Sequence, residues 1–222
     1  MLAKDLISDV VPAIRTSDKG KDALHWMEIF KVSHLPIVNE KELLGLISEN
    51  DIYDLNKPNT PIGNHKLNLI NPFVYDEQHV YEVIEMVSRL KITVIPVLDK
   101  KNNYLGVIIL QDLLQCFAKI TAVENRGGII VLEMNITDYS LSEISQIVES
   151  NGAKIVSLYI STPVDSYKMF VTIKVNTMDI NSILKTLERY NYNISATFSE
   201  NDEMGDFYQK RLDSLLNFLN IW

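Results

Sequence analysis

The chain has only one cysteine, Cys116, among its 222 residues. A single thiol cannot form a disulfide within the chain, which excludes a disulfide-stabilised extracellular framework and fits a reducing compartment. Long apolar runs are missing as well, since no stretch approaches the roughly 20 consecutive apolar residues that a membrane-spanning helix needs. We therefore expect a cytoplasmic protein with no membrane partner.

Positive charge is also scarce. The chain has 21 Lys and Arg residues against 29 Asp and Glu residues, which gives a net charge of −8. Nucleic-acid binding depends on a basic footprint that neutralises phosphates, so this balance argues against a nucleic-acid partner. An apolar fraction of 46% still supports a folded core.

Residue patterns typical of enzymes are absent from the sequence. The histidines His25, His34, His65 and His79 show no metal-ligand spacing with one another or with Cys116. The chain has no glycine-rich phosphate loop and no Gly-x-Ser-x-Gly elbow. We therefore predict no catalytic residues, no metal site and no enzymatic activity.

What the sequence does contain is an internal repeat with an offset of about 60 residues. The segment His34–Val38 reads HLPIV, and Val94–Leu98 reads VIPVL. Each is followed, beyond a polar turn, by a second apolar segment, Leu44–Ile47 or Leu105–Ile109, so each copy should form two short strands. A repeat of this length predicts two copies of one structural unit that pack together.

An amphipathic run precedes the strands in each copy. It covers residues 21–30 in the first copy and 79–90 in the second, where Val80, Val83 and Val87 recur at helical spacing. A further helix should begin after the second strand, with Ser48 as its N-cap in the first copy. Helix N-termini attract anions, so this junction is a candidate ligand site.

One motif follows the turn in both copies: Gly, two apolar residues, a Ser or Thr, two further residues and an Asp. Gly45–Asp51 (GLISEND) fits it fully, whereas Gly106–Asp112 (GVIILQD) has Ile109 in place of the hydroxyl residue. Together with Pro36 and Pro96, these motifs resemble the cystathionine-β-synthase (CBS) domain, which occurs in tandem as a Bateman module. The resemblance covers about residues 1–120.

The resemblance implies a cleft in each repeat for an adenosyl ligand such as AMP, ADP, ATP or S-adenosylmethionine. In that family the Asp accepts hydrogen bonds from the ribose hydroxyls, the Ser or Thr holds the ligand at the helix start, and apolar residues near the prolines enclose the base. The first cleft would be lined by Ile14, Leu35, Pro36, Ser48 and Asp51, and the second by Val74, Ile95, Pro96 and Asp112. The cations Lys31, His34, Arg89 and Lys91 are near enough in sequence to contact phosphates.

A simpler interpretation stays open beside this one. Asp51 and Asp112 would lie in the first turn of a helix in either case, where a carboxylate favours the helix dipole. The apolar residues around the prolines would be core residues in either case. Each of the four cations could be a solvated side chain at a helix end.

The second half has a different pattern. Strands are expected at 129–136, 155–160, 169–175 and 194–198, with helices over 141–148 and 180–187. Ser140 and Glu143 have the spacing of a capping box at the first helix. The order βαββαβ is the ferredoxin-like arrangement, so the whole chain is predicted to be α+β. Placed after tandem CBS units, it is similar to an ACT-type domain, as in acetoin-utilisation-type regulatory proteins. The turn at 138–141 lacks the Gly often found in amino-acid-binding ACT domains, which favours a packing or dimerisation role.

The last residues, 201–222, predict one further helix. Its apolar side chains follow a heptad seam: Tyr208, Leu212, Leu215, Leu219 and Trp222. This seam could pack on its own chain or on a second copy, and we expect a homodimer. The predicted domains are residues 1–58 (first CBS repeat), 59–122 (second CBS repeat), 123–200 (ACT-like domain) and 201–222 (C-terminal helix).

These features predict a non-enzymatic regulatory or sensor protein that binds an adenine nucleotide or related adenosyl ligand in its CBS pair. The alternative is an interaction or dimerisation scaffold that needs no ligand and whose CBS clefts are vestigial.

Overall fold

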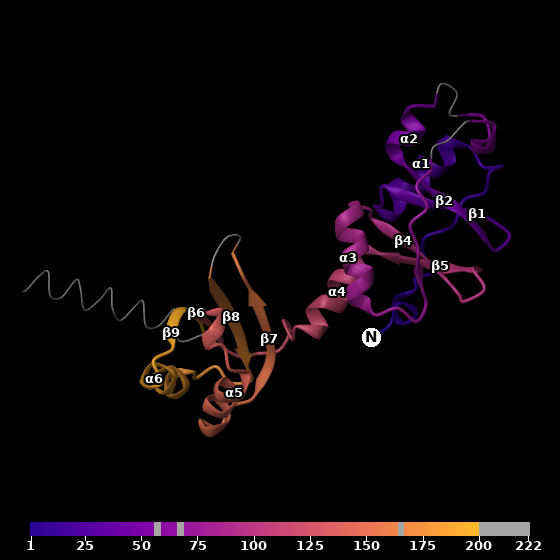
Figure 1. Cartoon of the computed structure of the whole chain (residues 1–222). Helices are drawn as coiled ribbons and strands as arrows, with labels where there is room; N and C mark the ends of the chain where they lie inside the picture. Colours follow the sequence, from indigo (N-terminus) through magenta and orange to yellow (C-terminus); the bar gives the residue numbers. More distant parts are fainter. Residues whose placement is uncertain (56–58, 66–68, 164–166, 200–222) are drawn as a thin grey trace, which may run out of the picture. The chain divides into compact units, whose positions relative to one another are not determined.

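A computed structural model of the chain describes residues 1–55, 59–65, 69–163 and 167–199. The chain divides into two compact units, Met1–Cys116 and Phe117–Trp222 (Figure 1). The expected helix over 201–222 lies outside the described residues. No helix in the described part of the chain is long and apolar enough to cross a membrane. The domain boundaries given above stay predictions.

The first unit contains the two repeats, and each folds as a helix, an antiparallel hairpin and a second helix. The first repeat consists of α1 (Gly20–Phe30), β1 (His34–Asn39), β2 (Glu42–Ser48) and α2 (Glu49–Tyr53). The second consists of β3 (Val74–Tyr75), α3 (Val80–Leu90), β4 (Val94–Leu98), β5 (Tyr104–Ile109) and α4 (Leu110–Ile120), whose residues from Phe117 onward belong to the second unit. Two 3-10 turns, Ala3–Leu6 and Ile62–Asn64, complete the unit.

The repeat extends to details of the backbone. Lys31 ends α1 and Lys91 ends α3, each in the left-handed conformation with a φ of 54°. In both hairpins the register shifts by one residue at the equivalent place, after Ile37 and after Val97. Both hairpins then contribute fully buried side chains to one shared core, among them Leu35, Ile47, Ile95 and Ile108. The apolar strands therefore hold the two repeats together.

The segment that leads into each repeat pairs with the other repeat. The amide of Leu46 in β2 donates to the carbonyl of Ile70, ahead of β3, over 2.8 Å, and the amide of Ser8 donates to Val107 in β5 over 2.7 Å. Further upstream, the amide of Ala3 donates to Gln78 over 2.9 Å, just before α3. The first residues of the chain thus complete the second repeat, an exchange that the sequence repeat does not reveal.

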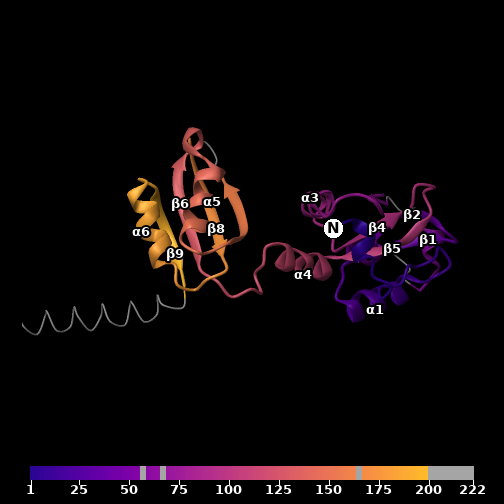
Figure 2. The same ribbon diagram turned by 90° about the horizontal axis from the view of Figure 1, so that it is seen from below.

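The second unit has the predicted element order βαββαβ. Its elements are β6 (Ile129–Asn135), the 3-10 turn Ile136–Asp138, α5 (Leu141–Ser150), β7 (Ile155–Ser161), β8 (Lys168–Val175), α6 (Asn181–Arg189) and β9 (Asn193–Phe198). The four strands form one sheet in the order β7-β8-β6-β9, and neighbouring strands are antiparallel. Both helices pack on one face of this sheet, where buried residues of α5 and α6 share a core with alternate residues of β6 and β8 (Figure 2).

The predicted capping box at α5 is only half formed. The amide of Glu143 donates to Oγ of Ser140 over 3.4 Å, so Ser140 caps the helix as expected. The Glu143 carboxylate does not reach back to the cap, because it accepts a 2.6 Å hydrogen bond from the hydroxyl of Tyr192, just before β9. Burial, together with this bond, raises the pKa of the Tyr192 hydroxyl above its ordinary range. A contact that is distant in sequence has displaced the local one.

Candidate functional site

Ser48 and Asp51 lie where β2 passes into α2, and they bind each other. Oγ of Ser48 accepts from the amide of Asp51 over 3.1 Å. In return, Oδ2 of Asp51 accepts from the amide of Ser48 over 2.8 Å and from its hydroxyl over 2.6 Å. This reciprocal arrangement is a capping box, which stabilises the start of the short helix.

Next to this cap, equivalent residues of the two repeats meet. The hydroxyl of Thr93, which precedes β4, accepts from the amide of Ser33 over 2.9 Å. Ser33 precedes β1 in the same way, so it is the counterpart of Thr93. The backbone carbonyls of these two residues also have equivalent partners. The carbonyl of Ser33 accepts from the amide of Glu49 at the start of α2, and that of Thr93 accepts from the amide of Leu110 at the start of α4, both over 3.1 Å. The two repeats are therefore joined by a polar contact between equivalent residues.

His34 connects this junction to the cap. In the hairpin His34 lies opposite Ser48, and its Nδ1 is 3.2 Å from the hydroxyl of Thr93. The ring is half-buried, and burial lowers its pKa from the ordinary value of 6.5, while the nearby carboxylates of Asp51 and Glu49 act in the opposite direction. The imidazole is therefore mainly neutral at pH 7, with carboxylates close by.

The apolar residues predicted to line the first cleft are part of the core. Ile14 and Leu35 are buried, with exposed fractions of 2% and 0%, and Pro36 is buried too. They are held together by backbone hydrogen bonds: the amide of Ile14 donates to Pro36 over 2.9 Å, and the amide of Val38 donates to Ile14 over 2.8 Å. Their side chains thus pack the region behind the cap, and a ligand contact with them stays a prediction.

The second repeat has the same backbone with apolar side chains in place of the polar ones. Val94, Ile109 and Leu110 stand where the first repeat has His34, Ser48 and Glu49, and Val94 lies opposite Ile109 in the hairpin. Asp112 lies in the first turn of α4 and is half-buried. The remaining residues predicted for this cleft, Val74, Ile95 and Pro96, are buried. Of the two predicted clefts, the first is therefore the polar one.

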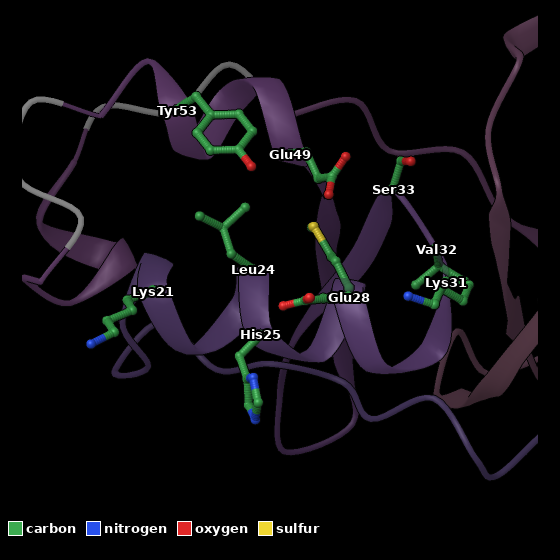
Figure 3. A pocket seen from close by; sticks show the side chains of 10 residues that line it. Lys21, Leu24, His25, Glu28, Lys31, Val32, Ser33, Glu49 and Tyr53 are labelled. Atoms are coloured by element: carbon green, nitrogen blue, oxygen red, sulfur yellow. The ribbon is translucent and has the colours of Figure 1, made fainter.

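A cavity of about 720 Å³ lies beside the cap, between α1 and α2. Figure 3 shows Leu24 on α1 pointing toward Tyr53 and Glu49 on α2, whereas His25 points away. Ser33 also lines this cavity and connects it to the inter-repeat junction. Lys31, one of the cations predicted to contact phosphates, lines it, whereas the residues predicted to hold the ribose and the base do not. The full lining is Lys21, Leu24, His25, Met27, Glu28, Lys31, Val32, Ser33, Glu49 and Tyr53.

Comparison with protein families agrees with the repeat. Residues 3–56 and residues 68–119 each match the CBS domain model. The chain carries a tandem pair of CBS domains. The matched segments contain Ser48 and Asp51 in the first domain and Asp112 in the second.

Individual proteins similar to this chain resemble it mainly over the same region. An inosine-5'-monophosphate dehydrogenase of Methanocaldococcus jannaschii is 24% identical over 149 residues, which is 65% of this chain and 29% of that enzyme. The chain thus matches less than a third of the enzyme's length. A CBS domain pair/ACT domain protein of Thermotoga maritima is 20% identical, covers 54% of this chain and 98% of its own, and has a TM-score of 0.48. The structure of CBSX2 in complex with AMP is 17% identical, covers 54% and 97%, and has a TM-score of 0.47.

The CBS pair contains functional candidates that the sequence motif did not predict. Thr93 and Ser33 are polar residues at equivalent positions of the repeat, a signal that could have found them. Glu49 and Tyr53 lie outside the motif's fixed positions, and only the fold brings them to the cavity. Among the candidate cations, His34 is at the site, whereas Arg89 pairs with Glu85 over 3.0 Å on the exposed side of α3.

The polar side chains at the junction beside the α2 cap can bind a ligand through hydrogen bonds. A carboxylate, two hydroxyls and a neutral imidazole lie within one junction, and the carboxylate accepts only. Such a set suits a ligand that offers hydroxyl donors. Within the described residues, no group of three or more His, Cys, Asp or Glu side chains is placed to hold a metal ion.

Proposed function

We propose that this chain is a non-enzymatic regulatory protein whose first CBS domain binds an adenosyl ligand: AMP, ADP, ATP or S-adenosylmethionine. The proposal depends on one observation. The polar cluster of Ser48, Asp51, His34 and Thr93 exists at the first junction, and its counterpart in the second domain is largely apolar. A nucleoside needs acceptors for its ribose hydroxyls, and a carboxylate provides strong, charge-assisted ones.

Ligand binding would be coupled to the helix cap. Both hydrogen bonds of the Asp51 carboxylate end on Oδ2, so Oδ1 can accept from a ribose hydroxyl while the cap persists. A ligand that draws the carboxylate away from Ser48 would loosen α2 instead. Either way, the ligand acts on the molecule through its unequal affinity for two arrangements of this junction.

The second unit is proposed to be an ACT-like, ferredoxin-type domain that assembles the protein or relays the signal. Its element order and antiparallel sheet support this assignment. The turn between β6 and α5 contains no glycine, which favours a packing role over amino-acid binding. We further propose a homodimer, because Leu110, Leu114 and Phe117 form an exposed apolar stripe on α4.

A ligand-independent scaffold is the second candidate. It is favoured by the fact that Ser48 and Asp51 satisfy each other and that the predicted base-binding residues are core residues. In that case the motif would serve only to cap α2 and to pack the domain.

Thermal unfolding of the full chain with each of the four ligands separates these functions. A ligand that binds only the folded protein raises its stability by about 2.7 kcal/mol at 100 times its Kd. Regulation through the CBS pair predicts a rise in Tm with at least one ligand that Asp51→Asn abolishes and Asp112→Asn does not. If all four ligands leave Tm unchanged at millimolar concentration, the scaffold is the correct function.

A further inference from the structure

The cavity between α1 and α2 is joined to the polar junction of the first CBS domain. Glu49 follows Ser48 of the cap directly, and its amide donates to the carbonyl of Ser33 over 3.1 Å. Ser33 lines the cavity and donates its own amide to the hydroxyl of Thr93 at the junction. The cavity volume of about 720 Å³ is that of a small-molecule site. A ligand whose ribose is held at Asp51 therefore has room to extend into it.

The ionic side chains of the cap and the cavity have an acidic balance. Lys21 and Lys31 line the cavity together with Glu28 and Glu49, and Asp51 adds the carboxylate of the cap. Two cations thus stand against three carboxylates. A site with this balance attracts a cationic ligand and repels a polyanion.

The cations of this region are also poorly placed to bind phosphates. Figure 3 shows Lys21 extending away from Glu28 and Glu49. Burial lowers the pKa of the His34 imidazole, so His34 is mainly neutral at pH 7. Arg89, another cation expected at the clefts, is paired with a carboxylate on its own helix. Lys31 is then the cation that remains for an anionic group of a ligand.

The carboxylate of Glu49 is free to take a cationic partner. Its residue is half-buried, and no described residue forms an ion pair or a hydrogen bond with its side chain. A partly desolvated carboxylate without a partner is stabilised when a cation binds it. The second repeat has Leu110 and Ser88 where the first has Glu49 and Glu28, so both cavity acids are particular to the first repeat.

The remaining lining of the cavity is apolar and aromatic. Leu24 and Met27 supply aliphatic surface from α1, and Leu24 points toward Tyr53 on α2 (Figure 3). The side chain of Tyr53 is 69% exposed, which leaves its ring accessible to a ligand. An aromatic ring attracts a cation to its face. The lining therefore suits a cation that is carried on a short aliphatic chain.

We propose that S-adenosylmethionine, and not an adenosine phosphate, is the ligand of the first CBS domain. This assignment rests on the adenosyl site proposed above and names the ligand from its charge. S-adenosylmethionine is a cation at pH 7, whereas AMP, ADP and ATP are polyanions. With the ribose at Asp51, the methionyl group enters the cavity, its sulfonium and ammonium groups are attracted by Glu28 and Glu49, and its carboxylate by Lys31.

Isothermal titration calorimetry of the full chain with three ligands tests this choice. S-adenosylmethionine should bind at least about 10-fold more tightly than AMP, the effect of one charge-assisted contact. S-adenosylhomocysteine has the same adenosine and amino-acid groups but no sulfonium charge, so it should bind several-fold more weakly than S-adenosylmethionine. Added salt should weaken the binding of S-adenosylmethionine and strengthen that of AMP, because it screens an attraction in one case and a repulsion in the other.

A pair of variants locates the effect. Glu49→Gln removes the charge at nearly constant shape, so it should weaken S-adenosylmethionine binding by about 10-fold and strengthen AMP binding. Glu42→Gln is the matched control: this exposed carboxylate begins β2, at the end of the strand far from Ser48, and its loss should leave both affinities unchanged.

The failures of the ligand assignment and of the adenosyl site are distinct. If AMP or ATP binds more tightly than S-adenosylmethionine and Asp51→Asn abolishes that binding, the adenosyl site stands and the ligand assignment is wrong. Unchanged S-adenosylmethionine affinity in Glu49→Gln would overturn the role of the cavity. If none of the adenosyl ligands binds, the adenosyl site itself is wrong, and the ligand assignment is overturned with it.

Discussion

At the scale of single residues, Asp51 caps α2 and is proposed to bind the ligand, and mutation can separate these two roles. Asp51→Ala removes the carboxylate from the cap, which should cost about 0.5–2 kcal/mol of the free energy of unfolding, as for other helix caps. It should also weaken ligand binding by about 1.5–3 kcal/mol, the range for hydrogen bonds to charged groups. Urea denaturation measures the first effect and calorimetry the second.

Ser48→Ala is the matched control for Asp51→Ala. It also breaks the cap but keeps the carboxylate, so affinity should fall by only about 0.5–1.5 kcal/mol, as for a neutral hydrogen bond. Equal losses of affinity in the two variants would show that the carboxylate acts only through the cap.

His34 makes the stability of the first unit depend on pH. Burial lowers the pKa of its imidazole below 6.5, so the unfolded chain binds more protons at this residue than the folded chain does. The contribution of neutral His34 is complete above about pH 6.5 and is lost as the pH falls through the lower, folded-state pKa. The groups that face the ring are Thr93, Asp51 and Glu49.

The effect of His34 can be measured by urea denaturation between pH 7.5 and 5, compared with His34→Gln. Between pH 7.5 and pH 5, the free energy of unfolding should fall less in His34→Gln than in the unmodified chain. A histidine resonance of His34 that titrates above 6.5 in the folded protein would contradict the predicted direction.

At the scale of secondary-structure elements, two glycines permit the exchange of leading segments between repeats. Gly45 has a φ of +146°, and a Cβ there would lie 2.8 Å from the carbonyl oxygen of Ile70. Gly106 has a φ of +154°, but its Cβ would meet a side-chain methyl of Ile7 at 2.6 Å, and a side chain can move. Gly152 has a φ of +77° with no neighbour within 4 Å.

We therefore expect a ranking of three Gly→Ala variants in urea denaturation. Gly45→Ala should cost the most, about 2–5 kcal/mol, because backbone strain and a clash with main chain add together. Gly106→Ala should cost less, and Gly152→Ala only about 1 kcal/mol of strain. If Gly152→Ala is less stable than Gly45→Ala, the leading segment at Ile70 does not require a glycine at position 45.

The elements themselves could be predicted from the sequence because their patterns are local. The helices α1 and α3 start within one residue of the predicted position, and the strands follow the alternation or apolar runs that marked them. The pairing of each leading segment with the hairpin of the other repeat could not be predicted. It depends on which hairpin edge the folded chain leaves accessible to that segment, and no local sequence pattern records this. The Glu143 carboxylate was expected in the cap of α5, yet it binds Tyr192, since a distant partner can outweigh a local one.

The candidate site was predictable only in part for the same reason. The motif located Ser48 and Asp51, whose proximity follows from helical spacing. Thr93 comes from the other repeat, and no local pattern connects it with His34.

At the scale of the whole molecule, the proposed homodimer is expected to form through the exposed stripe of α4. Leu114 is 68% exposed, and Leu110 and Phe117 lie one turn away on either side. Burying one leucine at an interface contributes about 1.5–3 kcal/mol, so Leu114→Asp should weaken a dimer by at least about 10-fold. Gln115→Asp, at an exposed position on the same helix, is the control. A full-length protein that sediments as a monomer at high micromolar concentration would contradict the dimer.

The most direct measurement is isothermal titration calorimetry of the full chain with the ligand that gives the largest thermal shift. The polar first junction and the apolar second one predict one dominant site per chain, lost in Asp51→Asn and kept in Asp112→Asn. Two sites of equal affinity, or a single site unaffected by Asp51→Asn, would contradict the assignment of the ligand to the first CBS domain.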